Sequence, residues 1–184
     1  MAGHSKWTQI KRQKSVTDAA KSRAFSRFAR LIAFQSKKAA GNVSAPGLAA
    51  ALLRAKAANM PKENIERAIA KGSSKESGDL AQVVYEAYGP SGVAILISAL
   101  TDNKNRTTRE IKHMLSTLGV ALASPGAATW AFSRTPDGVY MPNPPGVKVV
   151  GTDEERLSAV LTALDEHDDV ERVFTNAHGY EHTD

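Results

Sequence analysis

The sequence predicts an α+β protein, in which an N-terminal three-helix domain is followed by a ferredoxin-like βαββαβ domain. Three observations favour this fold class: apolar residues at helical spacing up to residue 71, apolar strand-like runs from residue 83 onward, and a polar Gly/Ser-rich stretch between them. We therefore expect a basic three-helix domain at residues 1–72, a linker at 73–79, an α/β domain at 80–178 and a tail at 179–184.

The first predicted helix covers residues 17–40 and is amphipathic. At 100° per residue, Phe25, Phe28 and Ile32 fall on one face, which therefore needs a packing partner.

Two further helices are predicted at residues 48–58 and 61–71. Pro61 suits the first turn of the later helix, and Gly72 is expected to end it.

The second half of the chain alternates strand and helix patterns. Strands are predicted at residues 83–88, 93–100, 128–133, 147–150 and 170–176, the first two forming one bent strand or a hairpin. Two helices are expected to open with capping boxes, Thr107 with Glu110 and Thr152 with Glu155. If the first two runs count as one strand, the order is βαββαβ. The aromatic residues of the strands are predicted to lie in the core: Tyr85, Tyr88, Trp130, Phe132 and Phe174.

Charge is distributed unevenly along the chain. Residues 1–72 contain fifteen Lys and Arg against three acids, whereas residues 73–184 contain nine against sixteen. A one-sided basic block is typical of a surface that neutralises nucleic-acid phosphates, although most charged helix faces are merely solvated. We therefore predict a nucleic-acid-binding protein rather than an enzyme.

The candidate phosphate contacts lie on the first helix and in the segment before it. They are Lys6, Lys11, Arg12, Lys14, Arg23, Arg27, Arg30, Lys37 and Lys38. Trp7 and Phe34 lie among these residues and are candidates for stacking on unpaired bases, with packing as the alternative. A second set of phosphate contacts is considered beside the loop 101–106, with an ordinary strand-to-helix loop as the alternative: Lys104, Arg106, Arg109 and Lys112.

Signals for catalysis, metals and membranes are weak. The absence of Cys excludes disulfides and thiolate metal sites, and no apolar run approaches the ~20 residues of a spanning helix. The acids at 153–155 suit the first turn of a helix, and those at 166–169 are interpreted as a solvated turn. We expect no cofactor, no metal, no small-molecule substrate and no membrane partner. A cytoplasmic location is expected, in preference to the mitochondrial matrix.

Four blocks of residues occur in order along the chain: Met1–Trp7 with Ile10, Lys11, Lys14 and Asp18; Asn59–Pro61 with Ile65–Ile69 and Lys71–Gly72; Tyr85, Glu86, Tyr88–Pro90, Gly92 and Val93; and Leu100–Asn103 with Asn105–Thr107. These blocks resemble the YebC/PmpR family, which includes a mitochondrial translational activator. The resemblance implies a helical N-terminal domain and α/β domains in a cytoplasmic or organellar protein. Members are commonly named DNA-binding transcriptional regulators, and others resemble ribosome-associated factors that relieve stalling on proline-rich nascent chains. Duplex DNA and ribosomal RNA, with the ribosome as a further partner, therefore both stay open.

The chain departs from this family at two places. Members insert another α/β domain between the strands predicted near Phe132 and Val147, where this chain has only a Pro-rich stretch, so we expect an intact fold with one domain missing. Ser91 stands where the family has Gly, a change that we expect to be tolerated if the turn does not require φ > 0.

Overall fold

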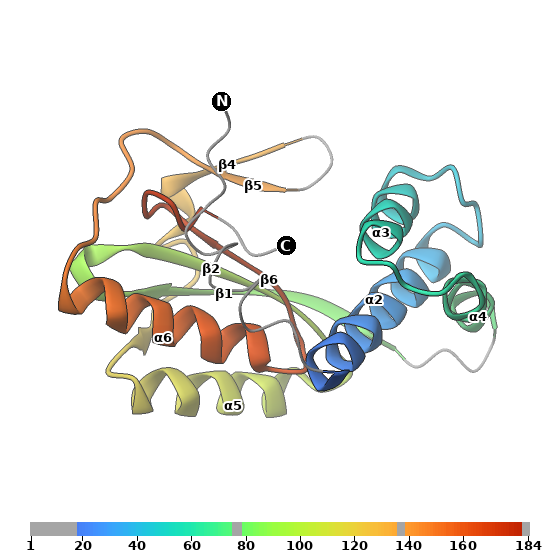
Figure 1. Cartoon of the computed structure of the whole chain (residues 1–184), viewed down its shortest axis with the longest axis horizontal. Helices are drawn as coiled ribbons and strands as arrows, with labels where there is room; N and C mark the ends of the chain where they lie inside the picture. The colour runs from blue at the N-terminus through green and yellow to red at the C-terminus, as the bar shows by residue number, and fades with distance from the viewer. Residues whose placement is uncertain (1–17, 75–78, 136–138, 182–184) are drawn as a thin grey trace. The chain divides into compact units, whose positions relative to one another are not determined.

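The structure is a computed structural model that describes residues 18–74, 79–135 and 139–181. The described chain divides into two compact units, with the boundary after Leu80 (Figure 1). The first unit is entirely helical and the second combines helices with antiparallel sheet, which confirms the α+β fold class.

The helical unit contains the three predicted helices, α2 (Asp18–Lys38), α3 (Pro46–Ala57) and α4 (Lys62–Ser73). They pack around one apolar cluster, whose buried members are Leu31, Ile32, Leu48, Ala51, Ala55, Met60, Ile65 and Ala68. The cluster combines one face from each helix, because none of the three can bury its apolar stripe alone.

The turn between α3 and α4 explains the Asn59–Pro61 block. Asn59 adopts a left-handed conformation with φ of 58°, its N–H donates to the carbonyl of Lys56, and Met60 N–H donates to that of Ala55. This pairing is the Schellman motif that ends many helices. Pro61 then precedes the first residue of α4.

Gly72 does not end α4 as predicted. It lies inside the helix and is buried, and a Cβ atom there would meet the carbonyl oxygen of Ala33 at 2.2 Å and Cβ of Ser36 at 2.7 Å. Beside it, the hydroxyl of Ser36 donates to the carbonyl of Ile69 at 2.9 Å. Glycine at this position therefore allows α2 and α4 to approach closely.

We expect Gly72→Ala to destabilise the helical unit by about 1–3 kcal/mol, because the added methyl group meets backbone and forces the helices apart. The change in thermal unfolding midpoint measures this effect. Gly47→Ala is the control, since a Cβ atom there meets only the end of the flexible Gln35 side chain. Equal midpoints for the two variants would contradict the close-packing role of Gly72.

The α/β unit is built on a four-stranded antiparallel sheet with strand order β3-β1-β2-β6. The strands are β1 (Ala81–Tyr88), β2 (Ala94–Thr101), β3 (Ala121–Leu122) and β6 (Val170–Thr175). β2 is buried along its whole length, which explains its continuous apolar run. α5 (Lys104–Thr117) connects β2 to β3. β1 lies between these two strands in the sheet and pairs with both, so β2, α5 and β3 form a split βαβ unit.

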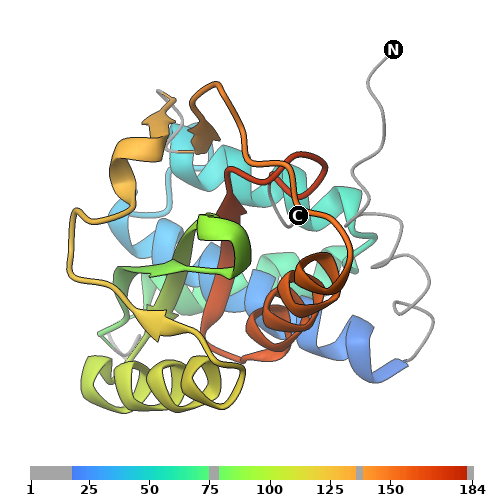
Figure 2. The ribbon, with the colours of Figure 1, turned by 90° about the vertical axis from the view of Figure 1, so that its left-hand side faces the viewer.

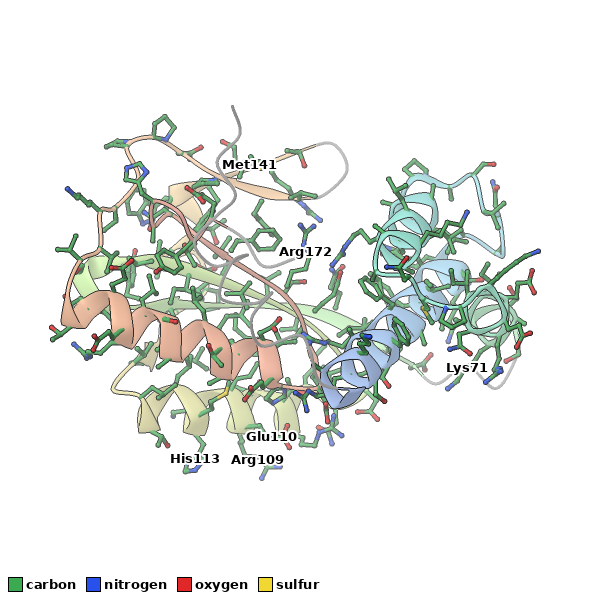
Figure 3. All side chains as sticks on the ribbon, viewed as in Figure 1. Lys71, Arg109, Glu110, His113, Met141 and Arg172 are labelled. Atoms are coloured by element: carbon green, nitrogen blue, oxygen red, sulfur yellow. The ribbon has the colours of Figure 1, made fainter. Side chains whose placement is uncertain are left out.

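Two layers cover the sheet. α5 and α6 (Thr152–Glu166) lie on one side, and the hairpin of β4 (Phe132–Arg134) and β5 (Tyr140–Pro142) lies on the other (Figure 2). Alternate β2 residues accordingly enter different clusters: Ile95 and Ile97 pack with the helices, and Leu96 packs with Phe132 and Phe174. Met141 on β5 is half exposed (Figure 3).

The first two predicted runs form a hairpin, which is one of the two alternatives expected for them, whereas later strand assignments need correction. Residues 129–131 are a short 3-10 helix, and β4 after it pairs with β5 instead of joining the main sheet. The run at 147–150 contributes only an isolated bridge between Val147 and Ala177. β5 lies within the Pro-rich stretch where the family insert is expected, and the absence of that domain stays a prediction.

The two expected capping boxes are also absent. Asn103 caps α5 by accepting the N–H of Arg106, whereas Thr107 lies buried inside the helix. Gly151 precedes α6 without a side-chain cap. A Thr-x-x-Glu spacing is short enough to occur by chance, and here the backbone places each helix start earlier in the chain.

Ser91 occupies a left-handed turn position, with φ of 57°. The turn therefore does require φ > 0, and Ser in place of Gly is strained there. The Ser91 hydroxyl donates to Asp153 at 2.7 Å, and this contact offsets part of the cost of the conformation.

Glu86 is a buried carboxylate that holds the loop between β3 and β4. Oε1 accepts the N–H of Gly126 at 2.7 Å, and Oε2 accepts the N–H groups of Ala128 at 2.6 Å and Thr129 at 3.0 Å. Burial by itself raises the pKa of Glu86, but these hydrogen bonds outweigh it and the pKa is lowered. The charged form therefore fixes the loop backbone.

Because the folded-state pKa of Glu86 is depressed, its ionisation contributes stability that is fully present above the unfolded value of about 4.3 and is lost as pH falls through the folded pKa. Glu86→Gln should lower stability at neutral pH and remove this component of the acid dependence. Denaturant unfolding at pH 7 and at about pH 3.5 measures both effects. A stability difference between wild type and variant that is the same at both pH values would contradict the role of the charge.

Candidate nucleic-acid interface

The predicted phosphate contacts on α2 share one face of that helix. Arg23, Arg27, Arg30, Lys37 and Lys38 lie within about 100° of arc at 100° per residue. Arg23, Lys37 and Lys38 are exposed, and Arg27 and Arg30 are half-buried. Ile32 and Ser36 are buried on the opposite side and anchor α2 in the helical unit, and the buried Leu31 and Ala33 flank the row of cations. We call the five cations the α2 basic face.

The C-terminal end of the α2 basic face has two defined contacts. The ammonium of Lys37 lies 2.8 Å from a carboxylate oxygen of Asp79, and this hydrogen bond and charge lower the pKa of Asp79. The ammonium of Lys38 lies 5.4 Å from the ring centroid of Phe34, which is half-buried. Both partners are weakly held surface contacts, which a phosphate can replace.

The other two helices of this unit carry fewer cations, and α4 mixes the two signs of charge. On α4, Lys62 pairs with Glu66 at 3.6 Å, and Glu63 and Arg67 are also exposed. α3 carries Arg54 and Lys56 without an acid, and the guanidinium of Arg54 lies over the ring of Phe28. Among the described residues of this unit, the largest row of cations therefore lies on α2. Figure 3 shows Lys71 projecting from α4.

Part of the predicted interface lies outside the described residues. This part comprises Lys6, Trp7, Lys11, Arg12 and Lys14, whose contribution stays a prediction.

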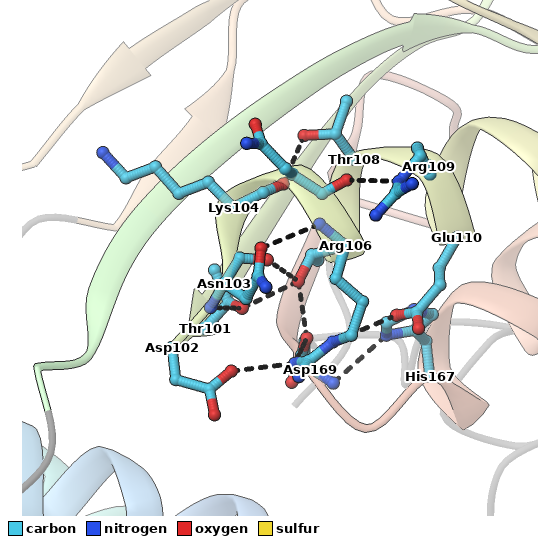
Figure 4. Close-up of polar contacts among 12 residues, drawn as sticks. Thr101, Asp102, Asn103, Lys104, Arg106, Thr108, Arg109, Glu110, His167 and Asp169 are labelled. Carbon is cyan, nitrogen blue, oxygen red and sulfur yellow. Dashed lines mark hydrogen bonds and ion pairs between the residues drawn. The ribbon is translucent and has the colours of Figure 1, made fainter.

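The second set of predicted contacts lies at the start of α5, and one of its members is held in an ion-pair network. Arg106 Nη2 lies 2.8 Å from Asp169 Oδ2 and 3.0 Å from Asp102 Oδ1, and its Nε lies 3.8 Å from Glu110 (Figure 4). The hydrogen bond and charge of Asp169 raise the pKa of Arg106. Arg106 thus has an internal structural role that the sequence did not indicate.

Lys104, Arg109 and Lys112 are the exposed members of the second set. In Figure 4, Lys104 extends away from the Arg106 network, and Arg109 Nε donates to the carbonyl of Asn105 at 3.2 Å. Arg109 projects from the solvent side of α5 (Figure 3). These three remain accessible to an anion, but two carboxylates, Asp102 and Glu110, lie on the same helix end.

Asp169 was missed by the sequence analysis, which placed it in a solvated turn. It is 5% exposed, and its Oδ2 lies 2.6 Å from the hydroxyl of Thr107, which in turn lies 2.7 Å from that of Thr101. Its backbone carbonyl also accepts the N–H of Leu100. Asp169 thereby joins the end of β2, the start of α5 and the turn before β6. Asp169 and Arg106 are 63 residues apart, so no local sequence pattern indicated that they form an ion pair.

The described residues contain no group of three His, Asp or Glu side chains arranged to hold a metal ion. In the same part of the chain, no helix has both the length and the apolar character to cross a membrane.

The protein combines a helical unit whose first helix carries a basic face with an α/β unit built on a split βαβ sheet. Residues 5–75 match the TACO1/YebC protein N-terminal domain, and residues 80–139 match the TACO1/YebC second and third domain. The chain therefore belongs to the TACO1/YebC family, which confirms the resemblance to YebC/PmpR proteins.

Curated relatives and a solved structure agree with this assignment. A probable transcriptional regulatory protein of Pseudothermotoga lettingae is 40% identical over 96% of this chain and 70% of its own length. Its namesake in Thermotoga maritima is 48% identical over 73% of this chain and 54% of its own, so the chain spans about half the length of that relative. The crystal structure of a conserved hypothetical protein from Aquifex aeolicus is similar with a TM-score of 0.76 and 26% identity, over 88% of this chain and 91% of that one.

Proposed function

We propose that this protein is a non-enzymatic, nucleic-acid-binding regulator of gene expression. The observation that carries the proposal is the α2 basic face, whose cations are exposed or half-buried on a helix anchored by a packed apolar core. A rigid helix holds its cations at fixed spacing, so less ordering entropy is lost on binding a polyanion.

The spacing of the α2 basic face suits a phosphate backbone. At 1.5 Å per residue, Arg23 and Arg30 are about 10 Å apart along the helix axis and Arg23 and Lys38 about 22 Å. Such a row can contact several successive phosphates, whose counterions are then released. Arg presents a planar fork that fits phosphate oxygens, which favours the three Arg as the centre of the contact.

Duplex DNA is the first candidate ligand, since the curated relatives are named probable transcriptional regulatory proteins. Structured RNA, and ribosomal RNA in particular, is the second. Its support is the composition of the α2 basic face, where the exposed neighbours of the cations are Ser22 and Ser26 and where Asn and exposed Gln are lacking among the described residues. Such a surface lacks the amide side chains that pair with adenine, and Arg held to phosphates contribute recognition by shape and charge.

Crosslinking in cells, followed by sequencing of both the bound DNA and the bound RNA, tests the proposal and separates the two ligands. Discrete genomic peaks near promoters support transcriptional regulation, and peaks in ribosomal RNA support a translation factor acting on the ribosome. Recovery of neither nucleic acid above the level of an Arg23/Arg27/Arg30→Glu variant would contradict the proposal. The proposal places the protein in the cytoplasm and requires no cofactor, small-molecule substrate or membrane partner.

A further inference from the structure

Trp130 and Tyr88 were predicted to lie in the core, and the structure places both at the surface. Trp130 is 67% exposed and Tyr88 is 38% exposed, whereas Tyr85, Phe132 and Phe174 are buried as expected. An exposed indole offers a large, flat apolar surface on which a ligand can pack.

The indole is held in place by hydrogen bonds. Its Nε1 donates to the Tyr88 hydroxyl at 2.9 Å, and that hydroxyl donates to the carbonyl of Ala127. The Trp130 carbonyl accepts from Nδ2 of Asn143 at 3.0 Å. The preceding loop is fixed through its N–H groups by Glu86, as described above. Trp130 is therefore ordered before any ligand arrives, which lowers the entropic cost of binding.

These contacts leave the ring faces, rather than polar groups, available to a ligand. The indole N–H is already satisfied, and the hydroxyl of Tyr88 both accepts and donates. Such a platform can stack on a flat π-system without reading its hydrogen-bonding edge.

The surroundings of the platform favour an anionic ligand. Residues 121–150 contain two bases, Arg134 and Lys148, and one acid, Asp137, although the α/β unit as a whole has an excess of acids. The carboxylate of Glu86 also lies at this loop, but it is buried and its oxygens accept three backbone N–H groups. Arg134 and Lys148 are both exposed, and Arg134 lies four residues beyond Trp130, at most about 13 Å along extended chain. The neighbours bonded to the platform are polar, whereas a protein partner is expected to require a contiguous apolar patch.

We propose that the platform formed by Trp130 and Tyr88 stacks on an unpaired base of a bound nucleic acid. The inference rests on the proposed function and extends it, because it assigns a single-stranded or looped segment to the α/β unit while the α2 basic face contacts phosphates.

Intrinsic fluorescence tests this inference, because the chain contains only two Trp residues and Trp7→Phe leaves Trp130 as the sole emitter. In the full-length Trp7→Phe protein, a single-stranded oligonucleotide of about 15 nucleotides should quench the emission, and its blunt duplex should not. Trp130→Ala should weaken single-strand binding about tenfold and leave duplex binding unchanged. Trp130→Phe keeps a ring face without the N–H and should retain most of the affinity.

Three results would each overturn the inference: no quenching by the single strand, equal loss of single-strand and duplex affinity in Trp130→Ala, or a shift of Trp130 emission with protein concentration alone. The last result assigns the platform to a second copy of the chain. An unfolding midpoint for Trp130→Ala close to that of wild type controls for folding. If only the stacking inference fails, wild-type protein still binds nucleic acid and the Arg23/Arg27/Arg30→Glu variant still loses that binding. If the proposed function fails, the wild-type protein binds neither the single strand nor the duplex.

Discussion

Replacing Arg23, Arg27 and Arg30 together with Glu should abolish nucleic-acid binding, with affinity falling at least ~100-fold near physiological salt. Each substitution removes a cation from the α2 basic face and adds an anion that repels phosphate. The dependence of affinity on salt should become shallower as well, since fewer counterions are released. Fluorescence anisotropy with labelled duplex DNA and structured RNA measures both quantities.

Two variants control this experiment. Lys62, Arg67 and Lys71 changed to Glu produce the same change of net charge on α4, where acids already accompany the bases, and should retain most of the binding. Arg23, Arg27 and Arg30 changed to Gln remove the charge without adding repulsion, which guards against unfolding at the two half-buried positions. Equal losses in the α2 and α4 variants would indicate a response to net charge alone and would remove the proposed interface.

Asp169→Ala should destabilise the α/β unit by about 2–4 kcal/mol. The substitution takes away the buried acceptor on which the guanidinium of Arg106 and the hydroxyl of Thr107 converge. Because Asp169 connects β2, α5 and the turn before β6, the loss should affect the whole unit. Urea unfolding followed by circular dichroism measures the change.

The neighbouring Asp168 is exposed and provides a matched control. Asp168→Ala should change stability by no more than about 0.5 kcal/mol, as expected for a surface position. If the two variants unfold at the same urea concentration, the Arg106 network has no stabilising role, and Arg106 returns to the set of available phosphate contacts.

The parts of the fold that could be predicted have a strong local pattern. The three N-terminal helices appear near their predicted bounds because their apolar faces repeat at helical spacing. β1, β2 and β6 were found through runs of six residues or more that are rich in β-branched, aromatic and other apolar side chains. By contrast, β3 has two residues and β5 contains a Pro, so neither carries a period that a sequence pattern can reveal.

The candidate site was predictable only where it lies on one regular element. The α2 basic face follows from helical geometry, which needs no knowledge of distant contacts. The roles of Arg106 and Asp169 depend on a contact between residues 63 positions apart, and the exposure of Trp130 depends on a short 3-10 helix in place of a strand. Tertiary packing decides such features, and a sequence pattern does not contain them.

The salt dependence of binding by Arg23→Ala tests most directly whether the α2 basic face contacts phosphates. Arg23 is exposed, so its removal leaves the apolar core untouched. We predict that the slope of log K against log salt on duplex DNA becomes shallower by about 0.9, and by about 0.7 on single strands, equally for unrelated sequences. An unchanged slope would show that Arg23 touches no phosphate and would contradict the proposed interface.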